Sequence, residues 1–226
     1  FVSEDNWTAR FSNPLYVEIE KLISSKFPTA KLGDIADLQK GDEPGSDKYI
    51  EYIEAKTSDI PFIRTTDIVN HECDLFPDFF ILKEFSNELN QDIKAGDILF
   101  TKDGKIGETA MLTEYDKALM SSGVSRIRLK AEAIKKYKFT FEYLFVCLSV
   151  RETGYYPAIR RTVIGTTIPH LREERMKQIS IPILQEGQIK SLTEKIKKAF
   201  KLKSERKKLI NEVLRQIDTE YEKFSK

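Results

Sequence analysis

Asp47, Glu54 and Lys56 have the types and order, an aspartate followed by Glu-x-Lys, with which many nucleases bind magnesium. Charged residues make up 32% of this chain, so such a pattern arises often by chance. His71 and His170 are the only histidines, and neither has a further metal ligand at useful spacing or the partners of a catalytic triad. The sequence therefore predicts neither a metal site nor a catalytic residue.

A second candidate for chemistry is "NPLY" at 13–16, which is similar to the Asn-Pro-Pro-aromatic loop that holds the target amino group in adenine methyltransferases. Leu15 stands in place of the second proline, and no glycine-rich turn for a methionine-derived cofactor lies upstream. Helix capping by Asn13 explains the same residues better. Gly104 and Gly107 fit a hairpin turn rather than a phosphate-binding loop. We therefore expect no cofactor.

A set of cationic and short polar residues falls at expected strand ends and turns. Side chains at such positions can contact the phosphates or base edges of DNA without catalysing a reaction on it. A surface salt bridge or a turn hydrogen bond is the alternative for each residue alone. Residues 1–100 carry 10 Lys and Arg against 20 Asp and Glu, whereas residues 101–226 carry 27 against 16, which favours contact between the second part and a polyanion. The predicted DNA-binding residues are Arg64, Thr65, Thr66, Lys102, Asp103, Lys105, Arg160, Arg161, Thr166 and Thr167.

The elements that must position these side chains mix helices with short strands, which predicts an α+β domain. Asn13 and Pro14 are typical of a helix start, and the apolar spacing that follows predicts a helix to about Ser25. "DILFT" and "IGETAML" flank "KDGK", whose Asp-Gly pair favours a tight hairpin turn. The apolar segment 139–150 predicts a buried helix. Short strands are expected within 61–68, 78–82, 96–112 and 123–129, and a loop at 42–47.

The C-terminal segment predicts one long helix, because no proline follows Glu186 and apolar residues recur every seven positions with a single break at Lys203. A helix of about 38 residues is about 57 Å long, which exceeds the diameter of the rest of the domain. We therefore expect a coiled-coil helix that needs a second helix to cover it. The chain divides into a recognition domain at 1–184 and this spacer or dimerisation helix at 185–226. The seam residues are Ile189, Ile196, Val213, Ile217 and Phe224.

The cysteines, the apolar runs and the N-terminal residues indicate the compartment in which the protein is found. Cys73 and Cys147 are far apart and have no partner spacing, which favours reduced thiols in a cytoplasm. No apolar run approaches the roughly 18 residues of a membrane span. The chain opens at Phe1 without the layout of a signal peptide, which indicates a piece of something longer.

Several blocks together resemble the target recognition domain of type I restriction-modification specificity subunits, including the helix that follows it. The match runs from about Lys31 to beyond Ile196. The blocks are, in order, "KLGDI", "KG", "IPFIRTTDI", "AGDILFTKDGKIGETAML", "SSGVSRIRL", "GTTIPHL" and "ISIPIL". This resemblance implies a domain that reads half of a bipartite site in double-stranded DNA. It also implies long helices that pair antiparallel as a spacer, adenine methyltransferase subunits that dock onto the assembly, and a restriction subunit as a further partner.

The resemblance also gives a role to residues 165–184, which would join the reading domain to the spacer and place Thr166 and Thr167 near DNA. A full specificity subunit has two recognition domains, and this chain has one. The chain is therefore a half-size subunit that dimerises, a part of a two-domain subunit, or the reader of a fused adenine methyltransferase or restriction enzyme, for which residues 1–30 look like a lead-in. A coiled-coil assembly protein that binds other proteins is the alternative from a different class, and DNA affinity that falls with salt distinguishes the two.

Overall fold

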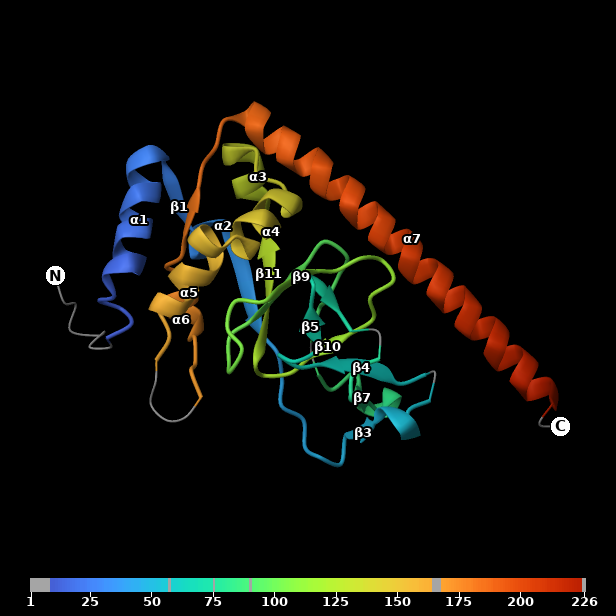
Figure 1. Ribbon diagram of the computed structural model, residues 1–226. Coiled ribbons are helices and arrows are strands. Elements are labelled where there is room, and N and C mark those ends of the chain that lie inside the picture. The colour runs from blue at the N-terminus through green and yellow to red at the C-terminus, as the bar shows by residue number, and fades with distance from the viewer. Residues whose placement is uncertain (1–8, 57, 75, 90, 164–167, 225–226) are drawn as a thin grey trace.

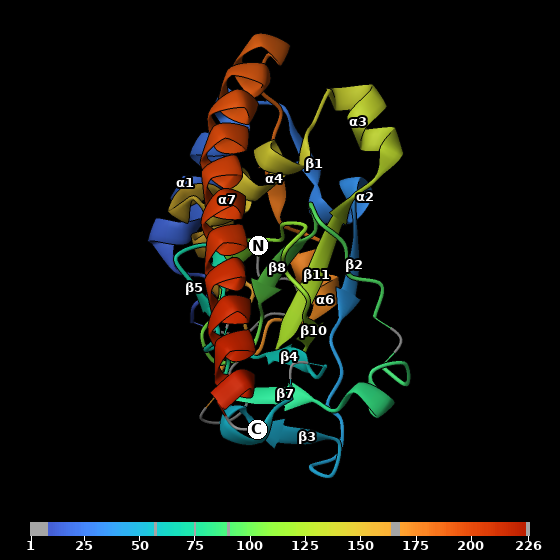
Figure 2. The same cartoon turned by 90° about the vertical axis from the view of Figure 1, so that its right-hand side faces the viewer.

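The computed structural model describes residues 9–56, 58–74, 76–89, 91–163 and 168–224. It shows short strands and helices around one main and two smaller clusters of buried apolar residues, and a long C-terminal helix that runs obliquely across them, which confirms the predicted α+β fold with a long terminal helix (Figure 1). Figure 2 shows the same long helix along the front of the domain. None of the described helices is long and apolar enough to cross a membrane.

Two four-stranded sheets form the framework. In the central sheet all neighbours are antiparallel, and in the second sheet β10 and β4 run parallel. The central sheet has the order β2 (Ala36–Lys40), β11 (Val124–Leu129), β8 (Ile98–Thr101), β9 (Thr109–Met111), and the second has the order β10 (Leu119–Met120), β4 (Ile60–Ile63), β7 (Phe79–Ile81), β3 (Tyr49–Glu51). Two further antiparallel pairs join β1 (Thr29–Lys31) to β12 (Ser180–Pro182) and β5 (Ile68–Val69) to β6 (Glu72–Cys73).

Helix α4 (Phe141–Ser149) is the buried helix that the apolar segment predicts. The Thr140 hydroxyl caps its N-terminus, and the side chains of Tyr143, Leu144 and Leu148 enter the main core beside the central sheet. The remaining short helical segments are α2 (Leu32–Ile35), η1 (Tyr52–Glu54), η2 (Lys83–Phe85), α3 (Ala131–Tyr137), η3 (Arg151–Tyr155), α5 (Tyr156–Arg160) and α6 (Glu173–Met176).

Helix α1 (Pro14–Lys26) begins where the sequence predicts, because the Asn13 side chain accepts a hydrogen bond from the Leu15 amide. The apolar residues whose spacing predicts this helix do not form a buried face, since Leu15 and Leu22 are exposed. The helix is held instead by its neighbour α5, against which the Tyr16 ring stacks on the Tyr156 ring.

The hairpin of β8 and β9 is confirmed, but its turn is longer than predicted. Phe100 pairs with Thr109, and the connection covers residues 102–108 rather than the tight "KDGK" turn. Gly104 and Gly107 both have positive φ, and the Gly107 amide donates to the Thr101 carbonyl at 3.0 Å. These two left-handed positions turn the chain inside a wider loop.

Helix α7 (Glu186–Phe224) has 39 residues, as the absence of proline predicts. Its first half packs on its own domain: Ile189 is 1% exposed in the main core, Ile196 packs against that core, and the Phe200 ring meets the Phe145 ring edge-on at 5.2 Å. In the second half Val213 and Ile217 are exposed. Of the predicted seam residues, Ile189 and Ile196 are therefore covered by the domain rather than by a second helix, because they complete the core beside α4, whereas Val213 and Ile217 are not covered by the domain.

Candidate nucleic-acid interface

Four connecting segments meet at one end of the two sheets, and we call them the loop face: residues 64–67 after β4, 102–108 between β8 and β9, 121–123 before β11, and 168–171. The Lys102 amide donates to the Gly123 carbonyl at 2.9 Å, and the Leu171 amide donates to the Lys102 carbonyl at 2.8 Å. A Cβ atom on Gly123 would lie 2.9 Å from Thr65 Cγ2, so the first and third segments are in close contact. Backbone contacts thus fix the relative positions of loops that are distant in sequence.

The segment around His170 is held from two sides. The backbone amides and carbonyls of His170 and Val163 bond to each other at 2.8 and 3.1 Å, and the Gly104 amide donates to the Pro169 carbonyl at 3.0 Å. Asp103 Oδ1 lies 2.9 Å from His170 Nδ1, while its Oδ2 accepts from Lys102 Nζ at 3.0 Å. His170 is half exposed and presents its ring at the loop face, although its sequence surroundings predict neither a metal ligand nor a triad residue. The position of His170 close to the predicted Thr166 and Thr167 in the sequence is the feature that could have indicated a place at this face.

The two predicted lysines of the hairpin loop have different environments. Lys102 is 7% exposed and its ammonium is paired with Asp103, so the expectation of a freely presented cation is wrong for this residue. Lys105 is exposed at the loop tip and lies 3.5 Å from the Glu108 carboxylate. An exposed pair of this kind contributes little stability and exchanges readily for another anion.

The turn after β4 carries three further predicted residues. The Arg64 guanidinium is one-third exposed, pairs with Asp78 at 2.6 Å and lies over the Phe79 ring. Thr65 is half-buried and Thr66 is exposed, with its hydroxyl 3.1 Å from the carboxylate of Asp67. Arg64, Thr65 and Thr66 therefore stand on the same face as Asp103 and Lys105.

Arg160 and Arg161 turn toward α1 instead. Both guanidinium groups pair with the Glu20 carboxylate, and Arg160 Nε also donates to the Phe11 carbonyl at 2.8 Å. Arg161 is buried, so its predicted availability to a polyanion is wrong: the side chain ties α5 to α1. Thr166 and Thr167 lie outside the described residues. Within the described ranges, no three His, Cys, Asp or Glu side chains are grouped to hold a metal ion.

The family model described as type I restriction modification DNA specificity domain matches residues 24–215. No curated protein sequence matches the chain.

Solved structures share the fold at low sequence identity. The HsdS subunit from Thermoanaerobacter tengcongensis is 15% identical with a TM-score of 0.51, and the match covers 88% of this chain and 48% of that one. A chain from a study of complex assembly and conformational transition in the type I R-M system is 15% identical with a TM-score of 0.50, covering 90% and 51%. The type IIG restriction endonuclease BpuSI is 10% identical with a TM-score of 0.54, covering 83% and 28%. The chain spans about half the length of the first two proteins.

Proposed function

The chain belongs to the family of type I restriction modification DNA specificity domains, and from this membership we propose that its loop face reads one half of a bipartite DNA site. A domain of this family recognises DNA in a restriction-modification system and is not itself the catalyst. The observation that carries the proposal is the convergence of four loops, distant in sequence, on one rigid face that holds six of the ten predicted contact residues. Loops on a rigid scaffold are where binding residues concentrate.

The side chains of the loop face divide by the contacts they can make. Lys105 is the exposed cation at the tip and suits a phosphate contact, which positions the domain without reading sequence. Arg64 can exchange the exposed Asp78 for a guanine edge or a phosphate. Thr66 and the Asp103–His170 pair offer short hydrogen-bonding groups for base edges. Thr166 and Thr167 stay predictions of the sequence resemblance.

Selection of bound duplexes from a random library tests this proposal, followed by binding measurements on the selected site over a range of salt. Lys105→Ala should weaken selected and unrelated DNA alike and reduce the slope of log affinity against log salt by about 0.9, the value for one phosphate contact. Removing a base-reading side chain at Asp103 or His170 should weaken the binding free energy for the selected site by about 1–3 kcal/mol and relax the preference at one base pair.

Lys135→Ala is the matched control, because Lys135 is also an exposed lysine and belongs to α3, at the end of the domain away from the loop face (Figure 1). It should leave affinity and salt slope unchanged. Equal effects of the two substitutions would place the DNA elsewhere. A wild-type chain that ignores DNA at low salt would favour the protein-binding alternative.

The exposed part of α7 supports a proposal about assembly. Leu202, Leu209, Val213 and Ile217 are exposed along one side of the helix, and soluble proteins rarely leave such a stripe uncovered. A second α7 is the simplest cover, supplied either by another copy of the chain or by a second recognition domain of a longer subunit. The chain covers only part of its structural relatives, so both sources remain within the proposal.

An antiparallel pair with its two-fold axis between residues 209 and 213 fits the charges as well as the apolar stripe. It sets Leu209 of one helix against Val213 of the other, and Glu220 of one helix opposite Leu202 of the other, next to Lys201. The two loop faces then lie at opposite ends of the pair, which matches two inverted half-sites. Val213→Asp should convert a dimer to a monomer in sedimentation at tens of micromolar, whereas a monomeric wild type would assign the stripe to a helix outside this chain.

Further partners follow from the family. DNA binding and assembly with adenine methyltransferase subunits come with the specificity role, and we propose that a restriction subunit joins the same complex. Restriction-modification acts on DNA inside the cell, so we propose the cytoplasm as the location, consistent with the two buried free thiols of Cys73 and Cys147.

A further inference from the structure

Near its middle, helix α7 carries three basic side chains that pair with acidic residues of the domain, and we call these contacts the ion-pair latch. Lys203 lies 3.4 Å from the Glu72 carboxylate and donates to the Asn70 carbonyl at 2.9 Å, and Arg206 pairs with the same glutamate. Lys207 pairs with Asp116 in the segment between β9 and β10. The latch joins one helix to two separate loops of the reading domain.

The pair of Lys207 and Asp116 is withdrawn from water. The two side chains are 1% and 3% exposed, so neither ion has solvent as an alternative partner. Asp116 Oδ2 also accepts hydrogen bonds at 2.7 Å from the amide and the hydroxyl of Thr113, which fixes the carboxylate. A small rotation of the helix would leave a buried charge unpaired, and this penalty makes a buried pair sensitive to orientation.

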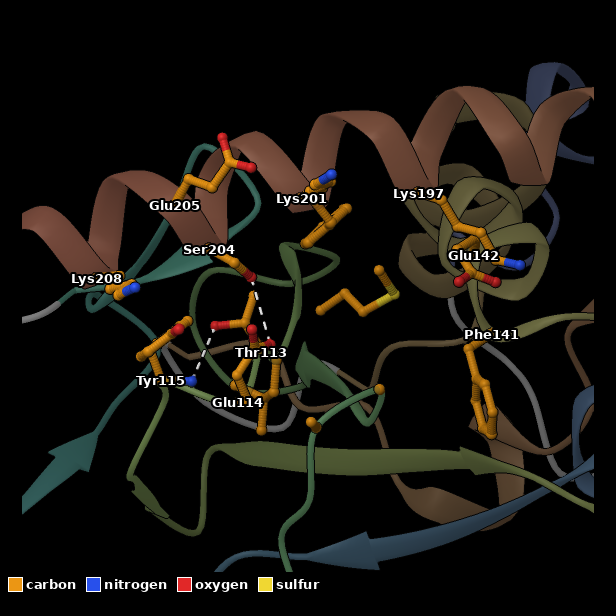
Figure 3. A pocket seen from close by; sticks show the side chains of 15 residues that line it. Thr113, Glu114, Tyr115, Phe141, Glu142, Lys197, Lys201, Ser204, Glu205 and Lys208 are labelled. Atoms are coloured by element: carbon orange, nitrogen blue, oxygen red, sulfur yellow. Dashed lines mark hydrogen bonds between the residues drawn. The ribbon is translucent and has the colours of Figure 1, made fainter.

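Beyond Phe200, apolar packing on the domain does little to fix the direction of α7, since Leu202, Leu209 and Val213 are exposed. On one side of the Asp116 loop, a cavity of about 450 Å³ separates α7 from the domain between Phe141 and Tyr115, and Lys201 and Ser204 face it from the helix (Figure 3). On the other side, a cavity of about 660 Å³ lies between Leu214 of the helix and the sheet of β3, β4 and β7. Past the first half of α7, which is anchored in the main core, the Asp116 loop therefore supports the helix between two spaces, and the ion pairs are its contacts there.

Both latch loops lead directly to the loop face. Glu72 belongs to the β5–β6 hairpin, which starts at Asp67, and the Asp67 carboxylate accepts from the Arg64 amide at 2.8 Å. Asp116 precedes β10, and the Ser121 amide just after that strand donates to the Ile63 carbonyl at 2.9 Å. Short, hydrogen-bonded connections thus link the latch to two of the four segments proposed to contact DNA.

We propose that the ion-pair latch sets the direction of α7 relative to the loop face, and so determines how many base pairs separate the two half-sites. This inference rests on the proposed reading and pairing functions. Lys207 and Asp116 are positioning residues, because both side chains are buried and would act through the helix that they hold. A helix pair of fixed length defines a single gap only if each helix leaves its domain at a fixed angle.

The test replaces the buried pair by neutral side chains of similar size, Lys207→Met with Asp116→Asn, which retains an acceptor for the Thr113 amide. Duplexes with variable gaps between selected half-sites are competed for binding. The wild type should prefer one gap length, and the double variant should lose at least threefold of its discrimination against gaps one base pair longer or shorter. The base preference within each half-site should stay unchanged.

Lys208→Met with Glu212→Gln is the matched control, since it removes an exposed ion pair one residue further along the same helix and should leave the gap preference intact. Unchanged discrimination in the buried-pair variant would overturn the proposal while leaving DNA reading in place. Absence of specific binding by the wild type would instead contradict the proposed function.

A distance measurement tests the latch without DNA. Spin labels at residues 105 and 221, in protein diluted with unlabelled chain, report the angle between loop face and helix. The distance distribution should at least double in width in the buried-pair variant, and an equally narrow distribution would overturn the proposal. If that variant does not fold, Glu72→Gln weakens the more exposed end of the latch and should broaden the distribution in the same direction.

Discussion

The two halves of helix α7 share one apolar repeat but have different surroundings. Ile189 and Ile217 occupy the same position of the seven-residue pattern, yet Ile189 is 1% exposed in the core of the domain and Ile217 is 60% exposed. The repeat specifies a helix with an apolar side, and it does not specify what covers that side. The domain covers the first half, and the second half is left for another helix.

The comparison also shows that the predicted seam combines two different stripes. At 100° per residue, Leu202, Leu209 and Val213 lie within a sector of about 40°. Ile189 and Phe200, which face the domain, lie about 140° and about 160° around the helix from the middle of that sector. A helix can therefore contact its own domain and a partner helix at the same time, on different sides.

The largest expected effect comes from placing a charge in each half. Ile189→Asp buries an unpaired carboxylate beside α4 and should cost about 4 kcal/mol or more, a large part of the total stability of a domain of this size. Ile217→Asp should leave the melting temperature of the domain within a few degrees and weaken only helix pairing. Thermal unfolding followed by circular dichroism checks both, and similar losses of stability would remove the distinction between the halves.

Ile196 belongs to the first half of α7, which is anchored in the domain and is called the anchored half, although the sequence pattern assigns it to the same seam as Ile217. It packs against the main core, so Ile196→Asp should destabilise the domain and would not yield a folded monomer. A design that tests pairing must use the exposed stripe.

A smaller effect separates Phe200 from Leu209. Phe200→Ala removes an aromatic side chain that is buried against Phe145 and should lower the free energy of unfolding by about 3 kcal/mol. Leu209→Ala truncates an exposed side chain and should change it by no more than about 0.5 kcal/mol in the monomer. Urea unfolding at low protein concentration measures both values. A larger loss of unfolding free energy in Leu209→Ala would show that the second half of α7 packs on the domain in solution.

The elements that the sequence predicts correctly are those specified by local signals. The cap at Asn13, the apolar segment before Val150 and the uninterrupted helix after Glu186 each depend on neighbours within a few residues. Pairings across long separations were not predictable from single elements. The parallel contact of β10 with β4 and the closure of β1 on β12 depend on how the whole chain packs.

The same limit applies to the candidate site. Residue type identifies Lys102, Lys105 and Arg161 as cations near turns, but whether each is available depends on a distant partner. Glu20 reaches Arg161 from a helix 141 residues away, whereas Lys105 meets only the nearby Glu108 within the described part of the chain. The division of the chain at residues 184 and 185 stays a prediction, and the buried Ile189 shows how closely the two parts are joined.

The smallest expected effect concerns α4, the support of the anchored half. Burial raises the pKa of the Cys147 thiol from 9.0 to about 12, so the folded state favours the neutral thiol. The contribution of the neutral Cys147 thiol to the free energy of unfolding is fully present below pH 9. It is lost as the pH rises from 9 toward 12, because the thiol ionises in the unfolded chain before it ionises in the folded one. At pH 10 the loss is about 1.4 kcal/mol relative to pH 8. Urea unfolding at both pH values should show a pH-dependent loss that is smaller by this amount in Cys147→Ala than in the wild type. Equal losses in the two proteins would mean that water reaches the thiol, and that α4 supports the first half of α7 less rigidly than the buried contacts of Ile189 and Phe200 require.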